Sequence, residues 1–277
     1  MQVIAHAKIN IRLEVIGRRS DGYHLLQSIM APISLADELT LQPTRRGVRF
    51  TTDDPALPTG GKNLVVRAAK ALLAEAGETR GVRIHLVKRI PQAAGLGGGS
   101  SDAAATLRAV RELLDLPVSD RRLRELAVGL GADVPFFLKD QACVAKGIGE
   151  VLRPYRVPKG LPLALVKPRE GLSTPEVYRA LGWPLTRRVK PSTLPPALRD
   201  GEMVCAWLRN DLEPPAIALL PRVAECKELL LGAGALGVQM SGSGPAVFGI
   251  FDDPTAAARA CNLARRKRWW AQACMLL

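Results

Sequence analysis

The sequence lacks the features that mark disulfide-bonded, zinc-binding and membrane-spanning proteins. Its five cysteines are odd in number, widely spaced and contain no Cys-x-x-Cys pair, which disfavours both a disulfide framework and a zinc site. No apolar run approaches the roughly 20 residues that a membrane-spanning helix needs. Residues 1–10 already alternate polar and apolar side chains and include Lys8, without the basic and then apolar layout of a signal peptide. A cytoplasmic protein that binds no membrane is expected.

Acidic residues are scarce relative to basic ones. The 277-residue chain has 39 Lys and Arg against 26 Asp and Glu, which gives a net charge of +13. Such a surface attracts anions, whether nucleic acid, an acidic membrane or phosphorylated metabolites. Charge alone does not choose among these partners. The length fits one large domain or two modest ones.

Strand and helix patterns surround a glycine-rich segment at residues 95–101. Residues 2–16 carry apolar side chains in near-alternation, which predicts β-structure ending at Gly17, with a turn after it. The alternating stretch 82–88 predicts a strand that leads into the glycine-rich segment. Apolar residues then recur at helical spacing through Leu114, so the segment joins a strand to a helix.

Serine and aspartate follow the glycines directly. Ser100 or Ser101 is expected to be the N-cap of the helix, because a serine hydroxyl accepts hydrogen bonds from first-turn amides. Asp102 suits the positive end of the helix dipole.

Prolines and glycine interrupt the strand and helix patterns in the second half of the chain. Four prolines and Gly160 lie in residues 154–168, and this segment is interpreted as the domain boundary, giving domains of residues 1–155 and 156–277. Residues 183–196 are proline-rich and basic, which favours an exposed excursion. A strand-like stretch over residues 246–251 and a helical pattern over residues 254–268 follow. Interleaved strands and helices throughout favour a mixed α/β or α+β protein.

The glycine-rich segment suits phosphate binding, because backbone amides without neighbouring Cβ atoms can converge on phosphate oxygens at a helix N-terminus. A flexible strand-to-helix turn is the alternative. The Walker A pattern is absent: the only Gly-Lys pair with a preceding glycine, at residues 60–62, lacks the earlier glycine and is followed by Asn63. The dinucleotide fingerprint also fails, since Ser100 stands at its last glycine position.

Several separated motifs together resemble the GHMP kinases, which include galactokinase, homoserine kinase and mevalonate kinase. Within the family they are most similar to the branch whose substrate is 4-diphosphocytidyl-2-C-methyl-D-erythritol. The resemblance spans roughly residues 3 to 250. Its motifs are Ala7-Lys8-Ile9-Asn10, Gly17-Arg18-Arg19-x-Asp21-Gly22-Tyr23-His24, the run from Pro91 to Ala105, Gly131-Ala132-Asp133-Val134-Pro135-Phe136-Phe137, Asn210-Asp211-Leu212-Glu213 and Met240-Ser241-Gly242-Ser243-Gly244-Pro245.

The resemblance implies an α+β fold of two domains with the active site in the cleft between them. The N-terminal domain would be a nucleotide-binding domain like ribosomal protein S5 domain 2, and the C-terminal, substrate-binding domain a ferredoxin-like α/β domain. The implied reaction transfers phosphate from ATP to the 2-hydroxyl of the methylerythritol moiety, in the non-mevalonate pathway of isoprenoid biosynthesis.

Phosphoryl transfer requires positioning, charge stabilisation and an acceptor for the hydroxyl proton. By resemblance, Asp133 is the general base, with a helix N-cap as its alternative role. Lys8 is hard to explain as packing in an apolar strand; the family reading pairs it with Asp133, and a snorkelling edge-strand lysine is the alternative. Asn10, two residues along the same strand face, is expected to orient the substrate.

The acceptor's cytosine ring offers a π-face and a hydrogen-bonding edge. By resemblance, Tyr23 and Tyr178 cover its two faces and His24 bonds its edge, although a lone histidine in a turn is more often structural. Thr174 is a weaker candidate for binding the diphosphate or the polyol.

ATP is the expected cosubstrate, and Mg²⁺ is expected to bridge its phosphates without a protein metal cage. Ser100 or Ser101 is a candidate to contribute a hydroxyl to the ion, and Lys88 and Asn63 are expected near the base or ribose. Ala93 stands where a glycine is common in the family, and His6 where a proline is common. The expected ATP-binding residues are Asn63, Lys88, Pro91, Gln92, Ala93, Ala94, Gly95, Leu96, Gly97, Gly98, Gly99, Ser100, Ser101, Gly242 and Ser243.

Two other functions stay open from the sequence. Another GHMP kinase, of homoserine or phosphomevalonate type, would share the glycine loop but has no reason to carry Tyr23 and His24. A nucleic-acid or anionic-membrane binder would use the net charge and the run of cations and tryptophans at residues 265–270, yet no RNA-stacking motif is present. The expected assembly is a monomer or a weak homodimer that binds no nucleic acid.

Overall fold

The computed structural model describes residues 1–184 and 189–277, and its chain packs into two compact units. The first unit holds residues 1–7, 36–92 and 97–140, and the second holds residues 8–35, 93–96 and 141–277. Strands β1 (Gln2–Arg18) and β2 (His24–Thr44) each contribute to both units. The expected boundary at residue 155 stays a prediction, because these units are defined by packing and each combines segments that are distant along the chain.

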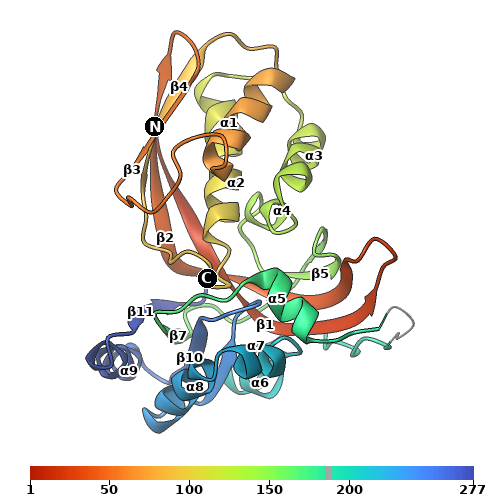
Figure 1. Ribbon diagram of the computed structural model, residues 1–277, viewed down its shortest axis with the longest axis vertical. Coiled ribbons are helices and arrows are strands. Elements are labelled where there is room, and N and C mark those ends of the chain that lie inside the picture. The colour runs from red at the N-terminus through yellow and green to blue at the C-terminus, as the bar shows by residue number, and fades with distance from the viewer. Residues whose placement is uncertain (185–188) are drawn as a thin grey trace. The chain divides into compact units, whose positions relative to one another are not determined.

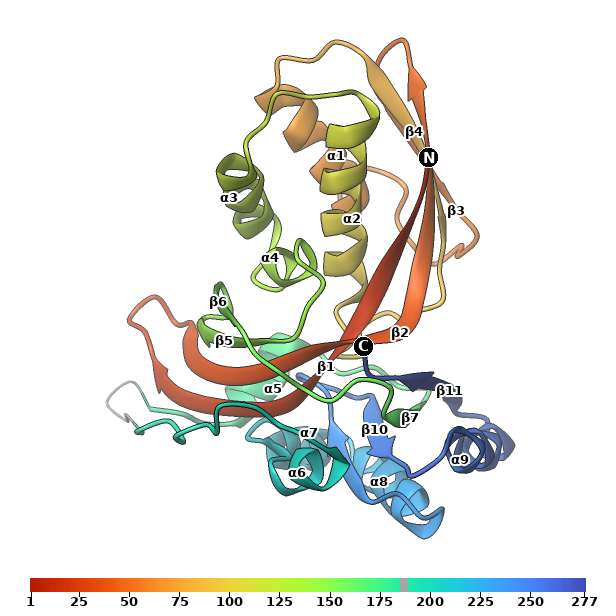
Figure 2. The same ribbon diagram turned by 180° about the vertical axis from the view of Figure 1, so that it is seen from behind.

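The first unit pairs the end of β2 with β4 (Gly81–Val87) in antiparallel register, Glu38 opposite Val87. Strand β3 (Val48–Thr52) lies parallel to β4. Four helices belong to this unit: α1 (Leu64–Glu75), α2 (Gly98–Leu113), α3 (Asp120–Leu130) and α4 (Val134–Phe137). Helix α1 packs on β3 and against α2 and α3, and α2 also contacts α4 (Figures 1 and 2).

The second unit contains an antiparallel four-stranded sheet in the order β11-β7-β10-β9. Its strands are β7 (Pro162–Lys167), β9 (Gly237–Met240), β10 (Val247–Ile250) and β11 (Trp270–Met275). Helix α8 (Arg222–Gly232) packs on β9 and β10, and α9 (Pro254–Arg266) packs on β7 and β11. The succession of strand, helix, two strands, helix and strand is the ferredoxin-like arrangement, so this expectation and the α+β class are confirmed.

The remaining elements of the second unit extend from the two long strands. The first part of β2 pairs with β5 (Cys143–Gly147), which pairs with β6 (Val151–Pro154). The second part of β1 runs parallel to the short β8 (Arg209–Asn210), with Arg12 opposite Arg209. Helices α5 (Thr174–Ala180), α6 (Gly201–Ala206) and α7 (Glu213–Leu219) complete the unit.

Apolar burial in the second unit explains why its helices adopt their positions. Helix α9 has Ala257, Ala260, Cys261 and Ala264 on its buried face, at the three- and four-residue spacing of an amphipathic helix. These small residues share one core with side chains of β7 and β10, including Val166 and Val247. The helical pattern expected from residue 254 is thereby confirmed, ending at Arg266.

Two further expectations concern the surface and the bilayer. The expectation of an exposed excursion is wrong at Trp183, which is buried in the core of the second unit. Pro184 and residues 189–196 are exposed or half-buried, and residues 185–188 lie outside the described part of the chain. Among described residues, no helix is long and apolar enough to cross a membrane.

Candidate functional site

Lys8 and Asn10 lie on the same face of β1, and both are 3% exposed. Lys8 Nζ donates to Asn10 Oδ1 at 2.6 Å. The Asn10 amide in turn donates through Nδ2 to Ser28 Oγ of β2 at 2.8 Å. The alternative of a snorkelling edge lysine is wrong, because the ammonium is buried. A buried ammonium is expensive to maintain unless it is paired, and Asn10 supplies a partner for this one; the catalytic role expected for Lys8 stays a prediction.

Asp133 directly precedes α4, where Phe136 and Phe137 are buried and anchor this single helical turn. Its backbone is helical, with φ −85° and ψ −15°, and its carboxylate makes no capping hydrogen bond to the turn. Asp133 therefore stands at the N-cap position of α4 without supplying a capping hydrogen bond from its side chain. Asp133 belongs to the first unit and Lys8 to the second, so their pairing stays a prediction.

Helix α2 begins at Gly98, with Gly97 as its N-cap in the left-handed region at φ +74°. The expected cap at Ser100 or Ser101 is wrong, because the loop reaches the helix through a conformation that glycine adopts readily and both serines lie within the first turn. The Ser101 hydroxyl instead donates to the backbone oxygen of His6 at 2.6 Å. Ser100 is half-buried, so it is the better placed of the two to reach a ligand.

The first part of the glycine loop, residues 93–96, packs within the second unit. The Lys8 amide donates to Leu96 O at 3.0 Å, and the Ala246 amide donates to Ala94 O at 3.2 Å. Ser241 Oγ donates to Gly95 O at 3.0 Å. A Cβ at Gly95 would stand 2.0 Å from Ser241 O, so only glycine fits here. Residues 93–96 of the loop and the motif at residues 240–245 are therefore built against each other.

Ala93 adopts φ +48°, although it carries a Cβ. A non-glycine residue in this region is strained by roughly 1–2 kcal/mol. The left-handed backbone at this position explains why glycine is frequent there in the family, since glycine adopts it without the strain that the alanine of this chain bears. Pro91 and Gln92 precede it in the first unit, where Gln92 Nε2 donates to Asp54 Oδ2 at 2.9 Å.

Lys88 lies in a buried cluster of charges rather than at the surface. Its ammonium donates to Asp37 and, at 2.7 Å, to Asp102 Oδ2. Burial lowers the pKa of Lys88, but the two carboxylates outweigh burial and the net shift is upward. Burial also raises the pKa of Asp102, to about 8. This cluster joins β2, the end of β4 and α2.

Asn63 is the N-cap of α1, with Oδ1 accepting from Val65 N at 2.8 Å and Nδ2 donating to Pro58 O. Both Asn63 and Lys88 thus have contacts within the protein that explain their burial. Their expected proximity to the ATP base or ribose stays a prediction.

Aromatic side chains gather beside the turn between β1 and β2. The His24 ring stacks on Tyr178 of α5, with centroids 4.9 Å apart and an interplanar angle of 27°. Burial, and then the charge of Arg18, lowers the pKa of His24, which favours the neutral form of the ring. Its Nε2 is buried and finds no hydrogen-bond partner among the described residues. Tyr23, in the turn, is 60% exposed.

Residues 241–245 bring further predicted site residues together in the second unit. Thr174 Oγ1 and Ser243 Oγ share a hydrogen bond of 2.6 Å. Gly242 has φ +56°, and a Cβ there would stand 3.4 Å from Asn10 Oδ1. Asn210 Nδ2 donates to both Met240 O and Gly242 O, which fixes the turn.

Three residues of this region were not predicted as site residues: Ser28, Asn210 and Ser241. Asn210 and Ser241 could have been found from the sequence, because both stand in motifs that carry the family resemblance. Ser28 stands in no such motif, and only the pairing of β1 with β2 reveals its contact with Asn10.

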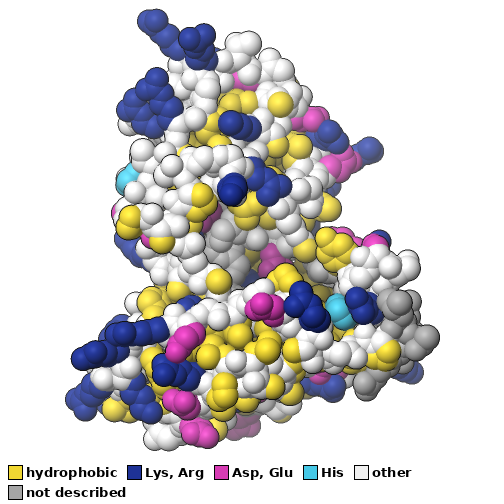
Figure 3. Space-filling model, viewed as in Figure 1, with side chains coloured by type: hydrophobic (Ala, Val, Ile, Leu, Met, Phe, Trp, Pro, Cys, Tyr) yellow, Lys and Arg dark blue, Asp and Glu magenta, His cyan; other side chains and the backbone are white. Residues whose placement is uncertain are grey.

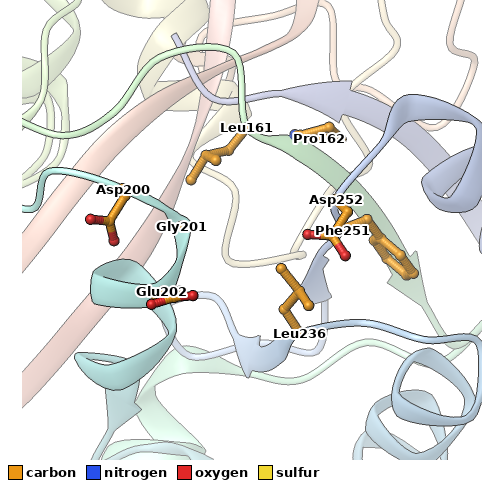
Figure 4. Close-up of a pocket in the computed structure, with 8 residues that line it drawn as sticks. All are labelled: Leu161, Pro162, Asp200, Gly201, Glu202, Leu236, Phe251 and Asp252. Atoms are coloured by element: carbon orange, nitrogen blue, oxygen red, sulfur yellow. The ribbon is translucent and has the colours of Figure 1, made fainter.

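A pocket of about 440 Å³ lies elsewhere in the second unit (Figure 4). No predicted site residue lines it. Its carboxylates are Asp200, Glu202 and Asp252, and Asp200 caps α6 by accepting from Met203 N.

Comparison with known proteins identifies the family. The model of the GHMP kinases N terminal domain matches residues 63–141, and that of the GHMP kinases C terminal matches residues 195–267. A 4-diphosphocytidyl-2-C-methyl-D-erythritol kinase of Geobacter sp. (strain M21) is 45% identical over 98% of this chain and 96% of its own. The chain belongs to this kinase family. The protein of the same name from Geobacter sulfurreducens is 46% identical, over 97% and 96% of the two chains.

Solved structures agree with the assignment to this GHMP kinase branch. A crystal structure of 4-(cytidine 5'-diphospho)-2C-methyl-D-erythritol kinase is 41% identical, with a TM-score of 0.84 over 100% of this chain and 99% of that one. A homoserine kinase from Cytophaga hutchinsonii, 19% identical with a TM-score of 0.72 over 100% and 94% of the two chains, shares the fold. The chain is thus a small-molecule kinase.

Proposed function

We propose that this kinase transfers the γ-phosphoryl group of ATP to the 2-hydroxyl of 4-diphosphocytidyl-2-C-methyl-D-erythritol. The products are the 2-phosphate and ADP, in the methylerythritol phosphate pathway to isoprenoid precursors. The observation that carries the proposal is 45% identity over nearly the whole chain to a protein of that name. The buried Lys8 and Asn10 pair and the aromatic cluster at Tyr178 support it.

Asp133, Lys8 and Asn10 are the proposed catalytic and orienting groups. Asp133 accepts the proton of the 2-hydroxyl as its oxygen attacks the γ-phosphorus, and the bond from that phosphorus to the β–γ bridging oxygen breaks to release ADP. Lys8 keeps Asp133 ionised and stabilises negative charge on the attacking oxygen or the transferred group. Asn10 orients the substrate, and its contact with Lys8 supports a shared role for the two side chains.

The glycine loop and the start of α2 are the proposed site for the ATP phosphates. The first amides of a helix have no partner within it and carry partial positive charge, which suits phosphate. Gly98 and Gly99 add no side chain there, and Gly242 and Ser243 complete the set from the second unit.

Mg²⁺ is proposed to reach the site on the nucleotide, where it would neutralise phosphate charge. Among described residues, no group of three His, Cys, Asp or Glu side chains could hold a metal. Ser100 or Ser101 is the proposed hydroxyl ligand, because the Ser101 hydroxyl donates its proton to His6 O and keeps the lone pairs of its oxygen, and Ser100 is half-buried.

Tyr23, His24, Tyr178 and Thr174 form the proposed acceptor site. Stacking on Tyr178 fixes the His24 imidazole, and its buried Nε2 is a polar atom suited to the edge of a cytosine. Tyr23 is exposed and can cover a base from solvent. Thr174 and Ser243 offer neighbouring hydroxyls for the diphosphate or polyol.

An ADP-release assay with a substrate panel tests the proposal. We expect turnover with ATP and the diphosphocytidyl methylerythritol, and no turnover with homoserine or phosphomevalonate. Phosphorylation of either of these with no activity on the cytidine substrate would show that the acceptor assignment is wrong.

The non-enzymatic alternative is tested in parallel. Basic side chains gather over α9 in Figure 3, where an anionic polymer would bind. Tight, salt-sensitive binding of RNA without ATP turnover would favour that alternative. We propose that the active protein is a monomer or a weak homodimer in the cytoplasm, with no nucleic-acid or membrane partner.

A further inference from the structure

Polar side chains occupy one buried face of β1, where a strand in a core would ordinarily carry apolar ones. Lys8, Asn10, Arg12 and Glu14 alternate along the strand and are each less than 10% exposed. Ser28 of β2, 1% exposed, lies against this face and contacts two of these residues. We propose that Ser28 is a positioning residue for phosphoryl transfer, which rests on the proposed roles of Lys8 and Asn10.

The directions of the hydrogen bonds assign the role of Ser28. Its hydroxyl donates its single proton to the backbone oxygen of Arg12 at 2.6 Å, and that oxygen can only accept. The oxygen of Ser28 therefore faces Asn10 as an acceptor, and Asn10 Nδ2 donates to it at 2.8 Å. The orientation of the Asn10 amide follows, with Nδ2 toward Ser28 and Oδ1 toward Lys8.

The orientation of the Asn10 side-chain amide decides whether the Lys8 ammonium faces its oxygen or its nitrogen. An ammonium carries three donors and no acceptor, so it requires the oxygen of Asn10 and is repelled by the amide nitrogen. With Ser28 present, a flipped amide would lose both hydrogen bonds and place two donors against each other. Ser28 thus holds the Lys8 ammonium in place through Asn10, without touching the reacting groups.

The backbone at Asn10 and at Ser28 also has contacts that do not involve the Ser28 hydroxyl. The backbone N–H of Asn10 donates to Ser241 Oγ at 3.3 Å, and Ser241 Oγ donates to Gly95 O. The backbone of β2 at Ser28 is paired with β5, opposite Ala145. Removing the Ser28 hydroxyl therefore leaves these backbone contacts in place, and it takes from the β1 backbone the hydrogen bond to Arg12 O.

A set of three substitutions separates the hydroxyl from the shape of the side chain. Ser28→Ala removes the hydroxyl, while Ser28→Thr and Ser28→Val have nearly the same shape and differ in whether a hydroxyl is present. We expect kcat to fall by about 10-fold to 100-fold in the Ala and Val variants, as for a misplaced reacting group. The KM for ATP should be unchanged, and Ser28→Thr should recover most of kcat.

A double-mutant cycle tests whether Ser28 acts through Asn10. If it does, Ser28→Ala combined with Asn10→Ala should be no slower than Asn10→Ala alone, because residues that act as a unit are not additive. Thr106→Val is the matched control. It removes another fully buried hydroxyl, which donates to Asp102 O in α2, and it should leave kcat near that of the wild type.

The outcomes distinguish failure of the proposed role of Ser28 from failure of the proposed catalytic roles of Lys8 and Asn10. Wild-type kcat in Ser28→Ala, equal rates for the Thr and Val variants, or additive losses with Asn10→Ala would each overturn the role of Ser28 while leaving the proposed kinase intact. Full activity of both Lys8→Ala and Asn10→Ala would overturn the catalytic assignment and, with it, the role of Ser28. Thermal unfolding of each variant shows that the rates belong to folded protein.

Discussion

Asp133 is the residue proposed here as the general base. It is half-buried, it precedes a single helical turn anchored by Phe136 and Phe137, and its side chain makes no capping hydrogen bond to that turn. Replacing it by Asn keeps the shape of the side chain and removes its ability to accept a proton. The substitution removes no capping hydrogen bond of α4, so its effect is expected on catalysis rather than on the stability of the helix.

We predict that Asp133→Asn lowers kcat by about 10²-fold to 10⁴-fold, the usual contribution of a positioned base. Nucleotide binding and the unfolding temperature should stay near the wild-type values. The measurements are ADP release at saturating substrates and the KM for ATP. Asp120→Asn is the control, because Asp120 is exposed and pairs with Arg111 at the surface. A variant that retains most of its turnover would exclude Asp133 as the base.

At the scale of elements, the sequence predicts where strands and helices lie better than it predicts the contacts of individual side chains. The alternation over residues 2–16 predicted β1, and the spacing after residue 103 predicted α2, because burial of one face imposes these periods. The cap of α2 was not predictable from residue type, since it depends on the left-handed conformation of Gly97. Ser28 was not predictable either, because its partner Asn10 comes from another strand.

The buried cluster around Lys88 ties together β2, β4 and α2 and makes their stability depend on pH. Burial raises the pKa of Asp102 from an ordinary 3.8 to about 8, so the folded state holds a proton that the unfolded state releases. The corresponding stability is complete below pH 3.8 and is lost as the pH rises through about 8. Protonated Asp102 leaves one balanced ion pair between Lys88 and Asp37.

We predict that Asp102→Asn removes this dependence, because an amide resembles the protonated carboxyl and cannot ionise. The free energy of unfolding of the wild type should fall between pH 5 and pH 8.5, whereas that of the variant should fall less. Urea unfolding at both pH values measures the difference. Asp120→Asn should keep the wild-type slope, since Arg111 lowers the pKa of Asp120 and its titration ends below this range. Parallel slopes for wild type and Asp102→Asn would contradict the prediction.

At the scale of the whole molecule, the sequence motifs divide between the two packing units. The strand of Lys8 and Asn10 and residues 93–96 belong to the second unit, whereas residues 97–101 and Asp133 belong to the first. The glycine loop therefore connects the units within a single family motif. Contiguous domains predicted from composition could not show this, because β1 and β2 contribute to both units.

The net charge of +13 acts on both proposed substrates, which are polyanions. A positive molecule raises the local concentration of anionic ligands, and salt screens this attraction as the Debye length falls from about 30 Å at 0.01 M to about 8 Å at 0.15 M. We predict that KCl raises the KM for ATP and for the cytidine substrate several-fold while kcat changes little.

Charge reversal distinguishes steering by the whole molecule from a specific contact. Arg259 and Arg266 are exposed on α9 and lie outside the proposed site residues. Arg259→Glu with Arg266→Glu should reduce the salt dependence of KM and leave kcat at high salt unchanged, because only the long-range field is altered. A KM independent of KCl in the wild type would show that the excess of basic residues plays no part in substrate capture. Retention of the full salt dependence in the double variant would instead assign it to charges other than these two.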